Sequence, residues 1–332
     1  MLLETKLHVP TPSPAFVPRP HLVALLDAGA GRQLTLVQAP TGFGKTTLLA
    51  AWCASVRHDR PCAWVSLGSD DNDPLRLWTY LIEALHRVDP AIGARSLAAL
   101  RAPGVSLLDV VLPLLINELA DLAHPVVLVL DDYQVVENQE CHRSVAFLIE
   151  HLPKTVQLVI STHSRPPLPL GRLRARGQLL ELQGADLRFT GEETAALLND
   201  RLQLKLDPAD LAVLHDRTEG WPAGLHLAAL TLKGHPNPHL RVKSFSGSHR
   251  HVIDYLGAEL LDAQPPPLRR FLLRTSILER LSADLCDAVT DSQGAAGLLR
   301  QLERANLFLL PLDERREWYR YHHLFADLLR HE

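Results

Sequence analysis

The stretch QLTLVQAPTGFGKTTLLAAW, residues 33–52, decides the fold. Its first six residues are β-rich, its centre holds two glycines, and its last third has the apolar character of a helix. A strand, a tight glycine-containing loop and a helix in this order are the context of a phosphate-binding loop. The stretch therefore predicts an α/β domain in which a strand leads into an anion-binding helix N-terminus.

The loop residues have separate expected roles. Gly42 and Gly44 let the backbone N–H groups turn inward. Lys45 supplies a charge for the β- and γ-phosphates, and Thr46 offers a hydroxyl to Mg²⁺. The expected nucleotide-binding set of this loop is Gly42, Phe43, Gly44, Lys45, Thr46 and Thr47. Ala39 stands where the usual motif has its first glycine, and a small residue is expected to suffice there. A glycine-rich turn with an exposed lysine is the alternative.

A second motif, VVLVLDDY at residues 126–133, is an apolar strand that ends in two acids. The carboxyl ends of parallel strands face the crevice in which such sheets bind ligands. We assign Asp131 to Mg²⁺ and Asp132 to the base that polarises the attacking water. A strand followed by an ordinary Asx turn is the alternative for this motif taken alone.

A third motif, VQLVISTHSRPP at residues 156–167, ends near Arg165. Arginine has a permanent charge, and its fork matches phosphate oxygens. Arg165 is therefore expected to reach a γ-phosphate and to act in catalysis with Lys45 and Asp132. A surface cation before a proline loop is the alternative.

Up to about residue 185, five β-rich runs alternate with helical patterns. The runs are QLTLVQ at 33–38, CAWVSL at 62–67, VVLVL at 126–130, VQLVIS at 156–161 and QLLEL at 178–182. Continuous apolar strands that alternate with helices predict a parallel sheet covered by helices on both faces. The predicted fold class is therefore α/β, of the P-loop type.

Beyond residue 190 the chain is expected to be mostly helical. Thr190 and Glu193 have the spacing of a capping box. Asp207 before Pro208 is an N-cap with proline at the first helical position. Two helices are expected to begin at these points.

The last part of the chain has the pattern of a winged helix. Residues 234–248 are rich in Gly, Pro, Ser and Asn, so they are the expected linker. Helical patterns and then two β-like runs, at 306–312 and 316–321, predict helices followed by a β-hairpin. The expected organisation is a strap at 1–20, a P-loop nucleotide-binding domain at 21–187, a helical domain at 188–240 and a winged-helix domain at 241–332.

Composition limits the classes of partner. The 34 Lys and Arg against 38 Asp and Glu give a net charge of −4, without the basic excess of a protein that coats nucleic acid. Residues 250–332 hold eleven basic and thirteen acidic side chains, so the winged helix is expected to bind nucleotide or protein rather than DNA.

Location is also an expectation from the sequence. Four widely spaced cysteines are expected to be reduced thiols. The first ten residues lack the apolar core of a signal peptide. No run approaches the roughly 18 apolar residues that span a bilayer. A cytoplasmic protein without membrane contact is expected.

Taken together, these motifs resemble the amino-terminal part of the MalT-like large ATP-binding regulators of the LuxR family, which are STAND-class signalling ATPases. The resemblance runs over essentially the whole chain and includes VPRP at 17–20, LRFTGEE at 187–193, GWPAGLHLAAL at 220–230 and WYRYHHLFADLLR at 318–330. It implies ATP or ADP and Mg²⁺ as ligands, bound by an α/β domain that a helical and a winged-helix domain follow.

The resemblance also implies roles for single residues. Val17 and Arg19 match the adenine-side strap, and Pro222 matches the helical-domain proline that packs near the base. Arg165 matches the sensor arginine. His322 matches the winged-helix histidine expected to face the β-phosphate of ADP. A core anchor at Val17, a helix-starting proline at 222 and a structural histidine at 322 are the alternatives.

The resemblance further implies a signalling switch coupled to transcription activation. ADP would favour a closed form, ATP with an inducer would favour a self-associating open form, and slow ATP hydrolysis would reset the switch. The family's inducer-sensing repeats and its LuxR DNA-binding domain are not among these residues, so inducer and DNA contacts are expected only through those parts. Two alternatives stay open, a continuously cycling remodelling ATPase and a STAND signalling ATPase with a non-transcriptional, defence output.

Overall fold

The chain divides into two compact units in the computed structural model, which describes residues 2–56, 60–233 and 238–332. The first unit comprises residues 1–13, 18–39 and 45–183, and the second comprises residues 14–17, 40–44 and 184–332. The division after Gln183 lies close to the predicted end of the nucleotide-binding domain. The finer boundaries of the strap and of the three domains stay predictions.

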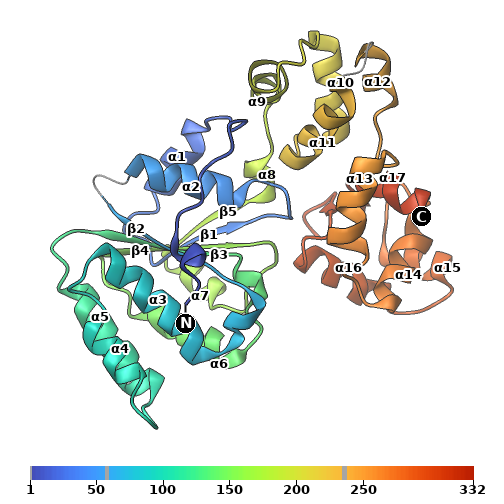
Figure 1. The fold of residues 1–332 in the computed structure, drawn as a ribbon. Coiled ribbons are helices and arrows are strands. Elements are labelled where there is room, and N and C mark those ends of the chain that lie inside the picture. The colour runs from blue at the N-terminus through green and yellow to red at the C-terminus, as the bar shows by residue number, and fades with distance from the viewer. Residues whose placement is uncertain (1, 57–59, 234–237) are drawn as a thin grey trace. The chain divides into compact units, whose positions relative to one another are not determined.

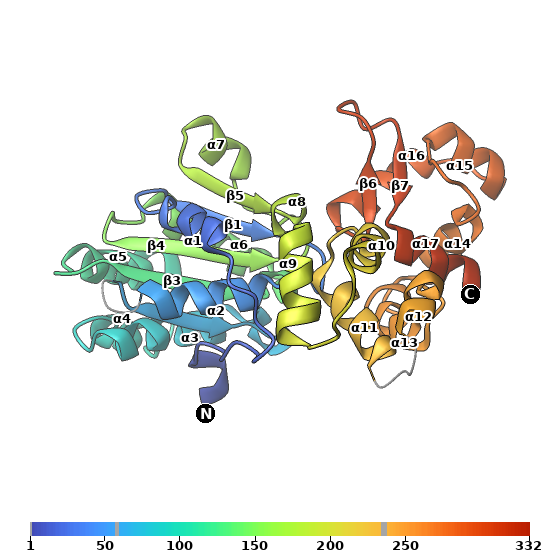
Figure 2. The ribbon, with the colours of Figure 1, turned by 90° about the horizontal axis from the view of Figure 1, so that it is seen from above.

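A five-stranded parallel sheet forms the centre of the first unit, with the strand order β2-β3-β4-β1-β5. All five predicted strands are confirmed, as β1 (Leu34–Gln38), β2 (Cys62–Ser66), β3 (Val126–Asp131), β4 (Val156–Thr162) and β5 (Leu179–Gln183). Every residue of β3 and β4 is buried, which explains why both read as continuous apolar runs. Because β4 lies between β1 and β3, its carboxyl end is next to the ends of both (Figure 2).

Helices cover both faces of this sheet. Figure 1 shows α1 and α2 on one side and α3, α5 and α6 on the other. The helices of this unit are α1 (Pro20–Asp27), α2 (Lys45–Val56), α3 (Pro74–Val88), α4 (Ala94–Leu100), α5 (Leu112–Ala120), α6 (Gln139–Glu150) and α7 (Leu170–Ala175). The core between the sheet and α3, α5 and α6 contains fully buried Trp78, Leu115 and Leu148. The predicted α/β class is confirmed.

The second unit begins with short helices whose starts follow the predicted caps. They are α8 (Gly184–Leu187), α9 (Gly191–Ala195), α10 (Pro208–Thr218) and α11 (Pro222–Leu232). Thr190 and Glu193 form the capping box at α9, and the Asp207 side chain accepts the Asp210 N–H at the start of α10. A π-helical turn, Ala196–Arg201, continues α9.

The prediction that residues 234–248 form a linker is wrong for residues 238–244, which form a helix. Residues 234–237 lie outside the described residues, but α12 (Pro238–Ser244) is a helix. Val242 and Phe245 are fully buried, and the Arg217 guanidinium donates to the Phe245 carbonyl. Burial of two apolar side chains therefore overrides the local Gly, Pro and Ser content.

A winged-helix arrangement closes the second unit, as predicted. Its helices are α13 (Arg250–Leu256), α14 (Pro266–Thr275), α15 (Ala283–Thr290), α16 (Ala295–Arg304) and α17 (His323–His331), with a π-helical turn at Gly257–Leu261. Between α16 and α17, β6 (Leu309–Pro311) pairs antiparallel with β7 (Tyr319–Tyr321). Among the described residues, no helix has the length and apolar character needed to cross a membrane.

Candidate nucleotide-binding site

The loop from Ala39 to Gly44 connects β1 to α2 and has the backbone of a phosphate loop. Gly42 and Gly44 have φ angles of 75° and 77°, in the left-handed region that favours glycine. Ala39 is fully buried and is not among the positive-φ residues of the described chain, so its backbone does not require glycine. The departure from the usual motif at this position therefore has a structural explanation.

Lys45 is the first residue of α2, and its side chain is almost completely buried. Its Nζ donates to the carbonyl oxygen of Ala39 at 2.9 Å. Burial lowers the pKa of Lys45, while the nearby charges of Asp132 and Asp131 act in the opposite direction. The alternative of an exposed lysine on a glycine-rich turn is thus excluded.

Asp131 ends β3 and bonds to two hydroxyls. Thr46 Oγ1 donates to its Oδ2 at 2.8 Å, and Ser161 Oγ donates to its Oδ1. Burial raises the pKa of Asp131, and the two hydroxyl donors partly oppose that rise. A hydroxyl and a carboxylate oxygen at this separation are hard ligands of the kind Mg²⁺ takes, so these residues fit the metal predicted for them.

Asp132 follows with a left-handed backbone, φ 58° and ψ 43°. Its N–H donates to Ser161 Oγ at 3.3 Å, and its Oδ1 accepts from Gln134 Nε2 at 2.9 Å. Gln134 Oε1 in turn accepts the His163 N–H at 3.0 Å. The two acids therefore have different hydrogen-bond partners.

Sequence reasoning missed Ser161, Gln134 and His163 as members of this cluster. Ser161 and His163 stand at and just after the end of β4, as Asp131 does at the end of β3. The rule that strand ends share one sheet edge could have found them. Burial and the Lys45 charge lower the pKa of His163, so its ring is neutral at pH 7.

Arg165 is not brought into this cluster. Its side chain is exposed, and within residues 2–56, 60–233 and 238–332 it forms no ion pair. The ionic surroundings of Asp131 and Lys45 do not include it. Its position here agrees with the alternative of a surface cation.

The strap residues are both buried, Val17 at 5% and Arg19 at 6% exposure. Arg19 precedes α1, and its carbonyl accepts the N–H groups of Leu22 and Val23. Val17 falls in the second unit and Arg19 in the first. Thr47 is the third residue of α2 and is half-buried.

In the second unit, loop residues 40–44 bond to the start of α11. The Trp221 indole donates to the Thr41 carbonyl at 3.2 Å, and the Ala223 N–H donates to the Gly42 carbonyl at 3.1 Å. A Cβ on Gly42 would lie 2.6 Å from the Cβ of Ala223, so this close approach also requires glycine. Pro222 starts α11 at its first position, as the plain alternative for it predicts.

His322 is the N-cap residue of α17 and is 1% exposed. Its Nε2 donates to the Thr218 carbonyl at 2.9 Å, whereas its Nδ1 has no hydrogen-bond partner among the described residues. Burial lowers the pKa of His322 to about 4, so the ring is neutral here. A charged ring, which a phosphate contact would favour, is not the state of this structure.

An aromatic cluster surrounds this histidine. The ring centroids of Trp221 and Phe308 lie 6.0 and 5.3 Å from the His322 ring. Phe43, the buried aromatic residue of the loop, lies 6.1 Å from Phe308. Within the second unit, aromatic packing therefore joins the predicted loop residue Phe43 to the predicted histidine.

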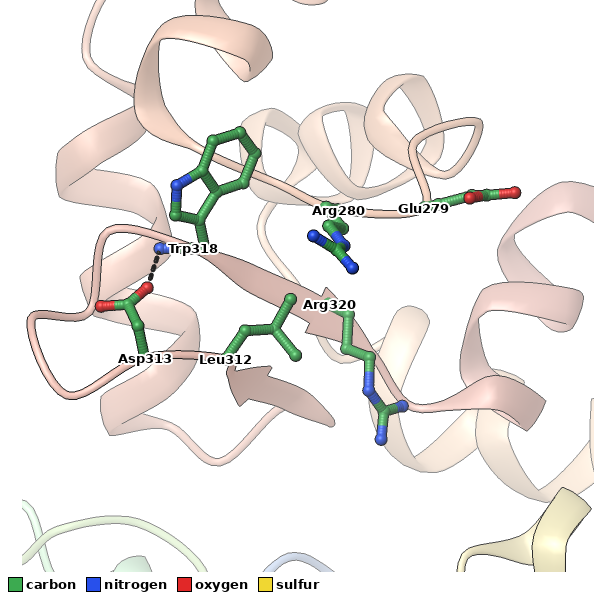
Figure 3. A pocket seen from close by; sticks show the side chains of 6 residues that line it. All are labelled: Glu279, Arg280, Leu312, Asp313, Trp318 and Arg320. Atoms are coloured by element: carbon green, nitrogen blue, oxygen red, sulfur yellow. Dashed lines mark hydrogen bonds between the residues drawn. The ribbon is translucent and has the colours of Figure 1, made fainter.

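A cavity of about 550 Å³ lies beside β7. Figure 3 shows its lining, Glu279, Arg280, Leu312, Asp313, Trp318 and Arg320. The Asp313 carboxylate accepts the Trp318 N–H at 2.7 Å and so fixes the turn of the hairpin. None of the residues predicted for the nucleotide site lines this cavity.

Comparison with known proteins shows which families this chain is similar to. A family model described as the MalT winged helix domain matches residues 257–332. The chain is 35% identical over 326 residues to the serine/threonine-protein kinase PknK of Mycobacterium tuberculosis, an alignment that covers 98% of this chain and 29% of that protein. It is 34% identical over 338 residues to the HTH-type transcriptional regulator MalT of Vibrio campbellii, covering 100% of this chain and 37% of that protein. The chain thus spans less than two fifths of the length of these relatives.

A solved structure shares the fold. The Walker-type ATPase of Pyrococcus abyssi aligns with a TM-score of 0.64 and 13% identity over 97% of this chain and 98% of that chain. The fold is therefore a P-loop type of α/β fold followed by a winged helix. The resemblance of the chain to MalT-type regulators is confirmed, and its last part matches the MalT winged helix domain.

Proposed function

We propose that this chain is the nucleotide-dependent switch of a larger signalling protein. It binds ATP or ADP with Mg²⁺ and hydrolyses ATP slowly, and hydrolysis returns a self-associating ATP form to a closed ADP form. The observation that carries this proposal is the arrangement of Lys45, Thr46 and Asp131, a buried cation and a bonded hydroxyl–carboxylate pair at the carboxyl edge of the sheet.

Each residue of that edge has one task. Lys45 exchanges its bond to the Ala39 carbonyl for phosphate oxygens, and the backbone N–H groups at the start of α2 complement the same charge. Thr46 and Asp131 would hold Mg²⁺, which when bound neutralises charge on the phosphates. Asp132 accepts a proton from the attacking water.

The remaining predicted residues have roles that follow from the family resemblance. Val17 and Arg19 border the adenine, and Pro222 packs near it. The unpartnered Nδ1 of His322 supports a role as the contact to the β-phosphate of ADP. That contact requires a proton on Nδ1, because Nε2–H already donates to Thr218 and a bare nitrogen cannot donate to phosphate. Arg165 reaches the γ-phosphate only after its loop moves.

Output and location belong to the larger protein. In a MalT-type regulator the switch controls transcription through a LuxR domain, an inducer acts through a sensor region, and the protein works in the cytoplasm. The similarity to a protein named as a kinase favours a second candidate, the same switch with a non-transcriptional output. A continuously cycling remodelling ATPase is the third.

The test is the nucleotide that the protein carries. The purified chain is denatured, the released nucleotide is separated by anion-exchange chromatography, and ATP turnover is measured on a parallel sample. We expect near-stoichiometric ADP and slow turnover. Rapid turnover with no retained nucleotide would favour the cycling ATPase, and absence of any nucleotide binding would contradict all three candidates.

A further inference from the structure

Gln134 links the ends of two neighbouring strands. It lies in the 3₁₀ turn Tyr133–Val135 that follows β3. Its Nε2 donates to Asp132 Oδ1 at 2.9 Å, and its Oε1 accepts the His163 N–H at 3.0 Å just beyond β4. Strands β3 and β4 pair directly, with Leu130 opposite Ile160, so both bonds span adjacent strand ends.

The backbone amide of His163 determines which way the Gln134 amide points. A backbone N–H can only donate, so the carbonyl oxygen of the side chain must face His163. The NH₂ group is then left to face Asp132. A carboxylate accepts hydrogen bonds and a reversed amide would place two oxygens together, so both bonds specify the same orientation.

The backbone of Asp132 limits where its carboxylate can point. Its φ of 58° is uncommon for a residue with a Cβ, and its N–H is held by Ser161 Oγ at 3.3 Å. Ser161 Oγ donates in turn to Asp131. Ser161 in β4 therefore holds the backbone of Asp132, and Gln134, which bonds to His163 just beyond β4, holds its side chain.

We propose that Gln134 is a positioning residue for the hydrolytic step. It holds the Asp132 carboxylate in the orientation that accepts the proton of the attacking water, and it ties this orientation to the loop that carries His163 and Arg165. The inference rests on the proposed function. A shift of residues 163–165 that broke the bond to Gln134 would release the base, so the loop after β4 controls hydrolysis through this side chain.

The test uses two variants that change the hydrogen-bonding groups of the Gln134 side chain. Gln134→Met has nearly the same length but has no donor for Asp132 and only a weak acceptor for the His163 N–H, whereas Gln134→His keeps one donor and one acceptor. Gln139→Met is the matched control, because Gln139 is exposed at the start of α6. For each, kcat and KM for ATP hydrolysis, ATP affinity by calorimetry and the thermal midpoint are measured on the 332-residue chain.

We expect Gln134→Met to lower kcat about tenfold, part of the range that a positioned base supplies, with KM and ATP affinity within about twofold of the starting protein. Gln134→His should recover a large part of kcat, and Gln139→Met should leave every value unchanged.

Three results would overturn the inference. The first is an unchanged kcat in Gln134→Met while the starting protein hydrolyses ATP, which leaves the proposed function intact. The second is an equal loss of kcat, affinity and thermal stability without recovery in Gln134→His, which makes the residue only structural. The third is a starting protein that binds ATP without hydrolysing it, which removes the proposed base together with its positioning residue.

Discussion

Glu219 and Arg320 are 101 residues apart in the sequence, yet the Arg320 nitrogens Nη1 and Nη2 lie 2.6 and 2.8 Å from the two Glu219 oxygens. Arg188 lies 3.3 Å from the same carboxylate, and the His323 N–H donates to it at 3.1 Å. One residue away, the Thr218 carbonyl accepts from His322. The end of α10 is therefore held to residues 319–323 by the ion pair of Glu219 with Arg320 and by the hydrogen bond from His322, the histidine predicted to contact the nucleotide.

Replacing Glu219 should destabilise the second unit. Glu219→Gln removes the negative charge that the Arg320 and Arg188 guanidinium groups contact, and breaking a fully buried ion pair costs roughly 3–5 kcal/mol. The Arg320 and Arg188 side chains keep 29% and 33% exposure, so we expect a loss of about 2–4 kcal/mol. Urea denaturation measures it, with exposed Glu192→Gln as the matched control. Equal effects of the two substitutions would contradict this role.

Acid should weaken the same ion pair within a defined pH range. Burial disfavours the charged form of Glu219, but the Arg320 hydrogen bonds and neighbouring positive charges lower its pKa to about 2, from 4.5. A carboxyl group whose pKa is lowered in the folded state stabilises the folded protein at pH values above the pKa of that group in the unfolded chain. Its contribution is thus complete above pH 4.5 and is lost as pH falls toward 2. The stability difference between the starting protein and Glu219→Gln should shrink over that range.

His322 should lower the free energy of unfolding as the pH falls from 6.5 toward about 4. Its folded pKa of about 4 lies below the ordinary 6.5, so the unfolded chain binds more protons between these values and stability falls as pH falls. From pH 7 to pH 5 the starting protein should lose about 2 kcal/mol more than His322→Phe, which cannot titrate. Urea midpoints at both pH values measure this. If His323→Phe, at an exposed position, changes the pH dependence as much, the assignment is wrong.

The same histidine should control release of ADP. A charge-assisted bond to phosphate is worth roughly 1.5–3 kcal/mol, so His322→Ala should release ADP about tenfold to over a hundredfold faster. His323→Ala is the control, since His323 lies near Glu219 and its side chain is 64% exposed. Stopped-flow release of a fluorescent ADP analogue measures both. A larger effect at His323 would contradict the proposed contact.

Asp131, the last residue of β3, and Asp132, which follows it, should have separable roles. Asp132→Asn should suppress hydrolysis and spare ATP binding, because it removes the base but not the bonds of Asp131 to Thr46 and Ser161. Asp131→Asn should instead weaken the Mg²⁺ dependence of ATP affinity. Calorimetry with and without Mg²⁺, together with a turnover assay, distinguishes them. Equal losses of binding and turnover in both variants would refute the separation.

The strands, the helix caps and the phosphate-loop motif could be predicted from the sequence. Each strand of the parallel sheet is a short apolar run. Thr190 and Asp207 are N-cap residues of α9 and α10, as predicted. Lys45 and Asp131 follow from motif spacing because the ends of parallel strands must share one edge. Such features depend on neighbours in the chain.

The remaining features depend on tertiary structure. Gln134 accepts the N–H of His163, which is 29 residues away in the sequence, because β3 and β4 pair side by side in the sheet. The pairing of Glu219 with Arg320 requires the whole second unit to fold. Residues 238–244 became a helix because burial outweighed their composition. The role of Arg165 stays a prediction, because its exposed side chain lies outside the cluster in this structure.

The most direct measurement is the affinity of ATP and ADP for the chain and for Lys45→Ala, by calorimetry with Mg²⁺ present. Exposed Lys154→Ala serves as the control for the loss of one positive charge. We expect Lys45→Ala to weaken both nucleotides at least about tenfold, since each charge-assisted phosphate contact is worth roughly 1.5–3 kcal/mol. Unchanged affinity in Lys45→Ala, or an equal loss in Lys154→Ala, would contradict the assignment of this loop as the nucleotide site.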